Sequence, residues 1–468
     1  MAQRTSTPKP TLTHEARRGQ TPPTAPRGSR SPARFVLGSA LDFQRDTLRF
    51  IQTVAATGDV VRYRFVIWPS MLVNHPDYIK RVLQENNRNY DKDNPSTWML
   101  KTVLGDGLLT NDGASWLRQR RLIQPAFHRQ RIAGFGALMV AEATAMLDRW
   151  DARPDPAAPL DVAAEMMGLT LRVVGQALFG ADVSGDVAAV DRSFTTVNTF
   201  ITRSLYEPYI MLPGAPARGK RGFRSARREL NQIIHRLIAE RQRDNGDRGD
   251  FLSLLLLARD AETGETMSGQ QAHDECLTLL LAGHETTAVA LSWTLYLLAR
   301  HPEVAERLQA ELATALAGRT PTIDDLPALP YTRMVIDEAL RLYPPAWAIM
   351  RRAIDDDELG PYHIPARTNV FISPWAIHRH PGYWEQPEVF DPERFSPARA
   401  AGRPHFAYLP FGGGPRLCIG NTFALTEAQL ILATIAQRYE LGLRPEQQVE
   451  PLPLITLRPR GGLRMAAR

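Results

Sequence analysis

The chain has 468 residues, of which 44% are apolar and 23% are charged, a composition that is ordinary for a soluble globular protein. Its two cysteines, Cys276 and Cys418, exclude a disulfide framework and favour a reducing compartment. The net charge of +6 belongs to residues 1–34, which hold seven basic side chains and one acid. Residues 35–468 balance at 49 basic and 49 acidic side chains, so the charge gives no reason to expect nucleic acid as a partner.

Residues 1–34 are rich in Pro, Thr, Ser and Arg and show no apolar periodicity. We therefore predict a disordered basic tail. The tail has no apolar segment of the kind that forms a secretory signal or a membrane anchor, so we expect a cytoplasmic protein. Its composition also fits an organellar transit peptide, an alternative that the sequence leaves open.

Short strands and long helices follow the tail. Residues 59–74 predict two strands separated at Pro69–Ser70, and helical patterns dominate from residue 115 to Leu342. Strands and Pro-marked turns are expected over residues 358–378, and a last helix over residues 421–440. No linker or repeat interrupts residues 35–468, so we predict one large, mainly helical domain with small β-sheets.

The run from Leu277 to Ala299 is long and apolar enough to raise the question of a membrane span. Polar residues interrupt its centre, and a lone acid there costs about 2.5–3.5 kcal/mol on insertion scales. Glu285 would have no partner in a single span. We predict instead a helix buried through the middle of a soluble domain, with no transmembrane anchor.

Cys418 lies in the glycine-rich segment FGGGPRLCIG, residues 411–420. A thiol nucleophile needs a histidine base, and the nearest histidine in sequence is His405. A zinc site needs about three more Cys or His ligands, and the only cluster, at residues 378–380, holds no second thiol.

One thiolate is enough as an axial ligand of haem iron, and glycines would let backbone N–H groups hydrogen-bond its sulfur. Arg416 could pair with a haem propionate. The chain has no C-x-x-C-H sequence, so any haem would be held non-covalently. A small apolar cysteine beside a glycine turn is the alternative interpretation of Cys418.

The segment FGGGPRLCIG resembles the haem-ligand loop of the cytochrome P450 family, F-x-x-G-x-R-x-C-x-G, at all five fixed positions. The resemblance covers about residues 35–468. It implies a P450-type catalytic domain with haem b between the long central helix and this loop, and Cys418 as the axial iron ligand. It also implies that four further loop residues contact the haem: Phe411, Gly412, Arg416 and Gly420.

The EALR and PERF segments match a family network of charged side chains. In EALR, the i,i+3 spacing places Glu338 and Arg341 on one helix face, and the resemblance implies that Arg394 of PERF joins them in a buried structural network.

In AGHETT, residues 282–287, the resemblance assigns Glu285 and Thr286 to proton relay and implies that Ala282 and Gly283 let the haem and its ligand approach closely. In isolation, the pattern favours a threonine bonded to a backbone carbonyl and a carboxylate paired with an arginine. His284 lies on another helix face, and we predict a packed or partly exposed histidine there.

In WLRQR, Trp116 and Arg120 lie side by side on a helix as two donors that could reach haem propionates, and a solvated basic face is the alternative. Arg118 and Arg121 are predicted at the surface, where they could meet an acidic redox partner. Arg351 matches a family position near the haem edge. The adjacent arginine, Arg352, competes for that assignment.

The resemblance implies a haem-thiolate monooxygenase that inserts one atom of O2 into a C–H bond of a lipophilic substrate. The chain carries no dinucleotide fingerprint and no iron–sulfur cysteine cluster, so a separate ferredoxin or flavodoxin with its NAD(P)H-dependent reductase is expected to supply electrons to a monomer. Alternatives are a haem-binding sensor or carrier without turnover, a peroxide-driven oxygenase and a haem-free cysteine hydrolase. The acid–alcohol pair, Glu285 and Thr286, argues against a sensor or carrier and against a peroxide-driven oxygenase.

Four aromatic and aliphatic segments are predicted to line the substrate pocket: residues 94–100, 197–212, 346–350 and 453–457. They fit a terpenoid, a fatty acid or a polyketide. RLYPPAW, residues 341–347, resembles members that act on terpenoid or carotenoid-like hydrocarbons. Arg203 could anchor a substrate carboxylate or face solvent.

Overall fold

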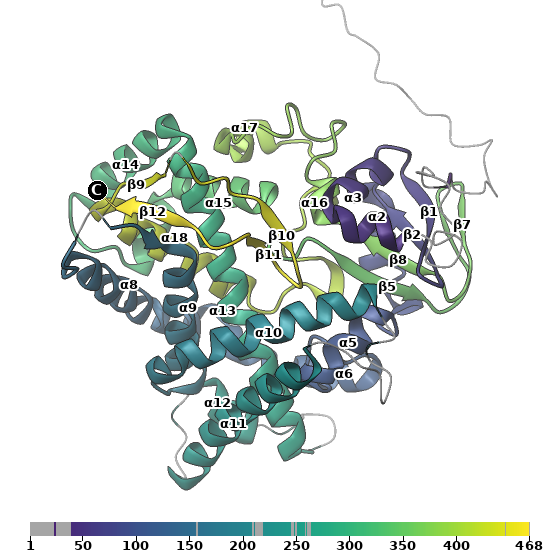
Figure 1. The fold of residues 1–468 in the computed structure, drawn as a ribbon, viewed down its shortest axis with the longest axis horizontal. Helices are drawn as coiled ribbons and strands as arrows, with labels where there is room; N and C mark the ends of the chain where they lie inside the picture. The colour runs from purple at the N-terminus through teal and green to yellow at the C-terminus, as the bar shows by residue number, and fades with distance from the viewer. Residues whose placement is uncertain are drawn as a thin grey trace, which may run out of the picture.

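A computed structural model describes residues 23–24, 39–155, 158–207, 210, 219–244, 248, 250–257, 259, 264–444 and 446–467. The predicted basic tail lies outside the described residues except for Pro23 and Thr24. Figure 1 shows a β-rich part at one side of the molecule and a larger helical part that fills the rest.

The β-rich part is built on a five-stranded sheet in the order β1-β2-β8-β5-β3. Its strands are β1 (Val60–Phe65), β2 (Trp68–Val73), β3 (Tyr90–Asp91), β5 (Ile349–Ala353) and β8 (Asn369–Ile372). Strands β2 and β8 are parallel, and the other pairs are antiparallel. Alternate residues of β1 and β2 enter two different hydrophobic clusters, so both faces of the sheet pack against core residues, except at the exposed Arg62 and Arg64 of the edge strand β1.

The β1–β2 turn lies at Val66–Ile67, so the predicted break at Pro69–Ser70 is wrong. Pro69 is the second residue of β2 and faces Arg64 in the ladder, a position near a strand start where a missing N–H is tolerated. Val66 adopts the left-handed conformation at φ 54° without a glycine. The sequence therefore carries no turn signal where the chain turns.

Helices form the rest of the core. Small helices at the sheet are α2 (Ala40–Arg45), α3 (Thr47–Ala55), α4 (Pro76–Lys80) and α16 (Pro374–Ile377). The larger part contains α5 (Pro95–Leu104), α6 (Gly113–Ile123), α7 (Arg129–Gly134), α8 (Gly136–Asp151), α9 (Val162–Phe179), α10 (Val187–Tyr206), α11 (Lys220–Asp244), α12 (Phe251–Leu257), α13 (Gly269–Arg300), α14 (Pro302–Leu316), α15 (Pro330–Leu342), α17 (Pro397–Ala400) and α18 (Asn421–Arg438).

Three small sheets complete the fold. They are the pair β6 (Asp357–Leu359) and β7 (Tyr362–Ile364), the pair β10 (Pro451–Pro453) and β11 (Leu457–Pro459), and the sheet β4 (Leu160–Asp161), β12 (Arg464–Ala467) and β9 (Leu441–Leu443). The mainly helical fold class with small sheets is therefore the one that the sequence predicts.

The helix α13 runs through the middle of the molecule (Figure 1) and is buried on nearly all sides, which is why its sequence is apolar all round. Ser268 and Gln271 form a capping box at its start. The helix α9 is long and apolar enough to cross a membrane, the one such case among the described residues, and 72% of it is buried. Because α9 packs along α13, it is a core helix.

A buried ion network ties α15 to the segment that precedes the cysteine loop. Glu338 and Arg341 are fully buried, and Nε of Arg341 lies 2.6 Å from Oε2 of Glu338. Nε of Arg394 lies 3.3 Å from the other oxygen, Oε1, of the same carboxylate. Arg341 also donates to the backbone carbonyls of residues 378, 387 and 389. The three residues that the sequence grouped therefore meet, and every charge in the group has a partner.

We predict that Arg341→Leu lowers the free energy of unfolding by about 3–5 kcal/mol, because it leaves Glu338 buried beside one arginine instead of two. Arg399→Leu is the matched control. Arg399 pairs with Asp391 at 2.6 Å next to the network but is 43% exposed, so its loss costs about 1 kcal/mol or less. Denaturant unfolding of the two variants measures the difference, and equal losses would contradict the assignment.

Candidate functional site

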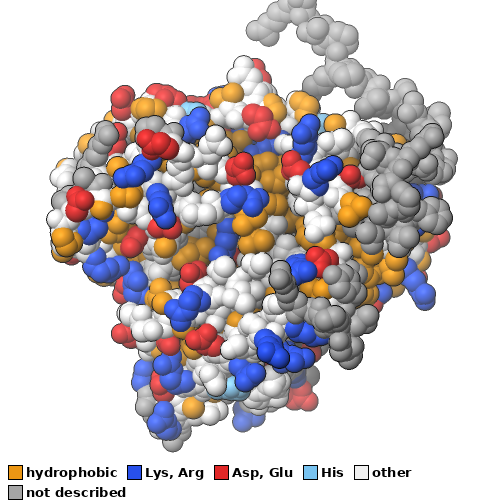
Figure 2. Space-filling model, in the orientation of Figure 1, with side chains coloured by type: hydrophobic (Ala, Val, Ile, Leu, Met, Phe, Trp, Pro, Cys, Tyr) orange, Lys and Arg blue, Asp and Glu red, His pale blue; other side chains and the backbone are white. Residues whose placement is uncertain are grey.

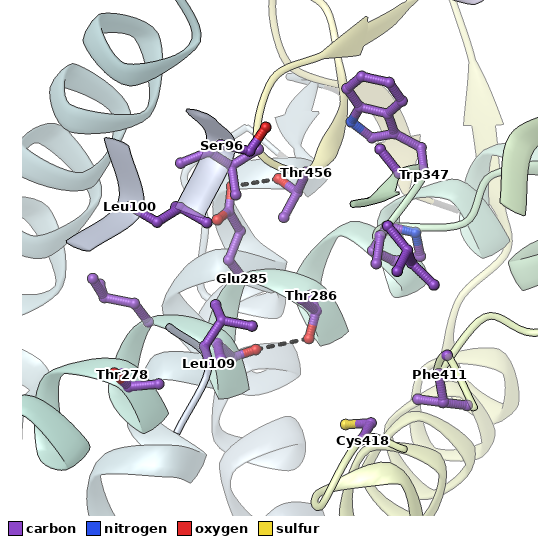
Figure 3. Close-up of a pocket in the computed structure, with 18 of the residues that line it drawn as sticks. Ser96, Leu100, Leu109, Thr278, Glu285, Thr286, Trp347, Phe411, Cys418 and Thr456 are labelled. Atoms are coloured by element: carbon purple, nitrogen blue, oxygen red, sulfur yellow. Dashed lines mark hydrogen bonds between the residues drawn. The ribbon is translucent and has the colours of Figure 1, made fainter. Parts of the chain in front are cut away.

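A cavity of about 540 Å³ lies between α13 and the 411–420 segment. Figure 3 shows Cys418 on that segment and Glu285 and Thr286 on α13 across from it. On the face of the molecule seen in Figure 2, basic and acidic side chains are interspersed, and hydrophobic side chains gather in a hollow near its middle. Most of the cavity wall is aliphatic or aromatic, which suits an apolar ligand.

Backbone geometry explains the glycines of the cysteine loop. Gly412 and Gly414 have φ angles of 72° and 66°, in the left-handed region that side chains disfavour. A Cβ atom on Gly414 would lie 1.9 Å from the carbonyl oxygen of Leu83. The Cys418 N–H donates to the Phe411 carbonyl at 3.0 Å and closes the loop, and Phe411, Gly412 and Gly420 all line the cavity.

The Cys418 residue is exposed, and it lines the cavity. Burial raises the pKa of Cys418, while a backbone hydrogen bond from Gly420 and the charge of Arg120 act in the opposite direction. The loop thus holds donors at the sulfur but does not by itself make the thiolate. A cation bound at the sulfur would complete it.

Four cationic side chains line the cavity: Lys92, Arg120, Arg351 and Arg416. Among the described residues, the carboxylate that pairs with this group is Asp112, which forms an ion pair with Arg416. Burial lowers the pKa of Arg351 to about 10, and burial followed by the charges of Arg351 and Arg416 holds the pKa of Lys92 well below its ordinary value. This excess of partly buried positive charge fits a ligand that carries two carboxylates.

Apart from the Arg416–Asp112 ion pair, neutral groups hold three of these cations. The Arg416 guanidinium stacks 4.0 Å from the centre of the Trp116 ring, and Arg120 donates to the Leu417 carbonyl at 2.9 Å. Arg351 donates to the Met350 carbonyl at 2.9 Å. Trp116 and Arg120 therefore lie beside the cysteine loop, as their spacing on α6 allows.

Of the two adjacent arginines of β5, Arg351 lines the cavity. Arg352 forms ion pairs with Asp91 at 2.7 Å and Asp93 at 2.5 Å, outside the cavity wall. The two side chains point to opposite faces because they are adjacent residues of one strand. Arg118, predicted at the surface, is 19% exposed and pairs with Glu265, which lies a few residues before α13, and Arg121 is exposed.

The acid and the alcohol on α13 have other partners than each other. The Glu285 Oε1 atom accepts hydrogen bonds from Thr456 at 2.6 Å, Asn198 at 3.2 Å and Arg458 at 2.5 Å. The Thr286 hydroxyl donates to the Ala282 carbonyl at 2.8 Å. This is the arrangement that the sequence left open as the alternative to a relay, and Oε2 of Glu285 has no partner among the described residues.

Burial raises the pKa of Glu285, and Arg458 and Thr456 partly offset that rise. Gly283 also lines the cavity, but a Cβ atom there would lie 3.1 Å from Val174. Its missing side chain therefore serves the close approach of α9 to α13. His284 is buried, its Nδ1 donates to the Leu280 carbonyl at 2.8 Å, and burial lowers its pKa to about 4.

All four segments predicted to line the pocket contribute to the cavity wall, through Leu100, Ile201, Trp347 and Leu454 among others. Residues 208–209 and 211–212 of the second segment lie outside the described residues. Arg203 is not part of the wall; it pairs with Glu207 at 2.7 Å.

Sequence reasoning missed five residues that shape the site: Lys92, Asp112, Asn198, Thr456 and Arg458. Thr456 lies inside a segment predicted to line the pocket, so its position was within reach. Lys92 and Asp112 belong to no motif, and Arg458 meets Glu285 across more than 170 positions of the chain. Only the folded chain brings these charges together.

Two further carboxylates on α13, besides that of Glu285, bind the loop between α5 and α6. Asp274 accepts from the Asp106 N–H at 3.0 Å, and Glu275 accepts from the Leu108 N–H at 2.9 Å. The same loop ends at Asp112. Glu275 is fully buried, and this burial raises its pKa to about 8.

The family model for cytochrome P450 matches residues 28–462 of this sequence. The chain belongs to the cytochrome P450 family. Cyclooctatin synthase of Streptomyces melanosporofaciens is 43% identical to this P450 over 430 residues, which cover 92% of each chain. Cyclooctat-9-en-7-ol 5-monooxygenase of the same organism is 38% identical over 87% of each chain, and pentalenene oxygenase of Streptomyces avermitilis is 36% identical over 90% of this chain and 93% of its own.

Membership confirms the predicted fold and reaction class: this P450 is a haem-thiolate monooxygenase that acts with O2, a lipophilic substrate and a redox partner. The family's cofactor is haem, and the cavity fits it on two observations. A thiol faces the cavity from the loop, and the cation group lacks the two negative charges that haem propionates would bring.

We predict that Arg351→Leu releases haem about ten-fold faster or more, because it removes a charged partner of a propionate. The variant's haem-free form is expected to be at least as stable as the wild type, since a buried cation without a carboxylate is gone. Transfer of haem to a scavenger protein and the thermal midpoint of the haem-free protein measure the two effects. Arg352→Leu is the control, and an equal rate of haem loss from both would refute the assignment.

We predict that the free energy of unfolding falls as the pH rises from about 5 to about 8, by up to about 1.4 kcal/mol per pH unit from Glu275 alone. In that range the folded protein keeps the Glu275 proton, and the unfolded chain releases it. Glu275→Gln removes this part of the slope. Denaturation of holoenzyme at several pH values tests it, with Glu303→Gln on the surface as control, and identical slopes in wild type and Glu275→Gln would show an ionised carboxylate.

Proposed function

We propose that this P450 hydroxylates a cyclic terpenoid. Three relatives that match about nine-tenths of the chain have names that refer to cyclooctatin, cyclooctat-9-en-7-ol and pentalenene. The observation that carries the proposal is the apolar cavity between Cys418 and the acid–alcohol pair of α13. Leu100, Trp347 and Ile455 belong to its apolar wall, and the cation nearest Thr456 in sequence, Arg458, is paired with Glu285 and so does not serve as an anchor for a fatty-acid carboxylate.

In this proposal the Cys418 thiolate would bind the haem iron, and haem b would be held non-covalently. Lys92, Arg120, Arg351 and Arg416 would hold the propionates with Trp116. Ala282 and Gly283 form the wall on the α13 side, and Phe411, Gly412 and Gly420 form the wall on the loop side. When bound, the haem supplies the oxygen-activating chemistry of the family.

The chain's own residues move the protons. Oε1 of Glu285 stays bound to Arg458, while Oε2 exchanges a proton with water in the cavity. The Thr286 hydroxyl turns from the Ala282 carbonyl to the same water and passes the proton toward the Cys418 side. The apolar walls keep other water away from the reacting C–H bond.

Electrons come from a ferredoxin or flavodoxin and its NAD(P)H-dependent reductase, because the sequence contains no dinucleotide-binding or iron–sulfur motif. We infer that residues 35–468 form the catalytic domain of a cytoplasmic monomer and that residues 1–34 form a separate basic tail. The family match begins at residue 28, close to that boundary.

We predict that Cys418→Ser loses the carbon monoxide absorption band that marks thiolate ligation in the reduced protein, because a serine hydroxyl does not provide the thiolate. Cys276→Ser is the matched control: Cys276 is 1% exposed, lies in the core and is outside the cavity wall, so the band remains. A band that persists in Cys418→Ser would refute the ligand assignment, and a colourless wild type would favour a hydrolase.

The same sample tests the substrate. Cyclic terpenes and terpene alcohols are expected to shift the Soret band and to yield hydroxylated products with a reductase and ferredoxin. Fatty acids and polyketides serve as comparison ligands. A fatty acid bound and oxidised in preference to every terpenoid would contradict the proposed substrate class, and binding without product would favour a sensor or carrier.

A further inference from the structure

Glu427 on α18 is a buried carboxyl group without a charge partner. Its side chain is fully buried, and neither oxygen has a hydrogen-bond partner among the described residues. Two other buried acids of this P450 are compensated by cations, Glu338 by two arginines and Glu285 by Arg458, while Glu275 accepts a backbone N–H. The polar group beside Glu427 is the Thr287 hydroxyl of α13.

The charge state of Glu427 follows from this environment. An ionised carboxylate in an apolar site costs many kcal/mol, so such a group keeps its proton. Burial accordingly holds the pKa of Glu427 well above its ordinary value. A neutral carboxylic acid is a hydrogen-bond donor.

Thr287 is placed to accept that hydrogen bond. Its own hydroxyl hydrogen is committed to the Gly283 carbonyl at 3.2 Å, which leaves lone pairs on Oγ1 for a donor. Thr287 lines the cavity, and the neighbouring Thr286 makes the equivalent bond to Ala282. Thr286 and Thr287 therefore make similar hydroxyl bonds, but it is Thr287 that lies beside the Glu427 carboxyl group.

Glu427 also belongs to the helix that begins directly after the cysteine loop. The first turns of α18 line the cavity through Phe423 and Ala424, and α18 packs against α13. A hydrogen bond between Glu427 and Thr287 would therefore connect the thiol side of the cavity to its acid–alcohol side. A leucine would fill the same space without that connection.

We propose that Glu427 is a positioning residue: as a neutral acid it donates a hydrogen bond to Thr287, fixes the Ala282–Thr287 turn of α13 against α18, and so leaves Thr286 as the hydroxyl that turns to cavity water. The inference rests on the proposed function for its consequence in catalysis. Loss of the bond frees Thr287 to reorient, admits water at the wrong place and diverts electrons from product to reduced oxygen species.

The first test is spectroscopic and does not require turnover. Wild-type holoenzyme at neutral pH should show the infrared C=O stretching band of a protonated, buried carboxylic acid, and the difference spectrum with Glu427→Gln should contain the lost band. A difference spectrum that shows a lost carboxylate band instead would overturn the proposal, because an ionised Glu427 cannot donate.

The second test separates a hydrogen-bond role from a proton-transfer role. Glu427→Gln keeps a neutral donor of the same shape and should form as much product per NAD(P)H as the wild type. Glu427→Leu removes the donor and should lower that ratio about five-fold, the effect of one hydrogen bond. If Glu427→Gln were as impaired as Glu427→Leu, the positioning role would be wrong.

A double-mutant cycle tests the partner. Thr287→Val should lower the same ratio about as much as Glu427→Leu, and the double variant should be no worse than either, because both changes delete one interaction. Thr294→Val is the matched control, since Thr294 is a buried α13 threonine bonded to the Ala290 carbonyl. Additive effects, or an equal loss in the control, would overturn the proposal.

The two levels of inference can fail separately. If the wild type gave no hydroxylated terpenoid, the proposed function would be wrong, and the infrared band together with the same cycle on thermal midpoints would still decide the Glu427–Thr287 bond. If Glu427→Leu did not fold, the infrared spectrum and the Thr287→Val and Glu427→Gln variants would still confirm or refute it.

Discussion

Uncompensated positive charge beside Cys418 is the constraint on which the site depends. Lys92, Arg120, Arg351 and Arg416 come from four separate segments and meet one carboxylate, Asp112. Like charges in a low-dielectric site repel one another, so the protein around them must hold the segments in place. Stacking on Trp116 and hydrogen bonds to backbone carbonyls do this in part, and the dianionic cofactor of the family supplies what is missing.

The acids near the α13 side of the cavity show how burial gives one residue type different tasks. Glu285 keeps three donors on a single oxygen, whereas Glu275 holds a backbone N–H of the α5–α6 loop and has a raised pKa. Glu427 belongs to the neighbouring helix α18, and its carboxyl oxygens have no hydrogen-bond partner within the part of the chain that the structure describes. Each environment sets a different balance between the charged and neutral form.

Sequence reasoning succeeds here where the information is local. The cysteine loop is recognisable because Gly414 and Cys418 must lie a fixed number of residues apart, and the 282–287 segment because one helical turn holds all its groups. The turn at Val66–Ile67 escaped because neither residue is a turn former. Lys92 and Arg458 escaped because long-range contacts define them, and no spacing rule connects β11 to the middle of α13.

The origin of Arg458 also has a consequence for how the protein is made. Synthesis proceeds from the N-terminus, so α13 leaves the ribosome long before β11 does, and Glu285 waits for its arginine while more than 170 further residues are added. The ligand loop is also translated after α13. A nascent chain can therefore form much of its helical core early, but the catalytic centre assembles last and through contacts distant in sequence, which are the slow ones.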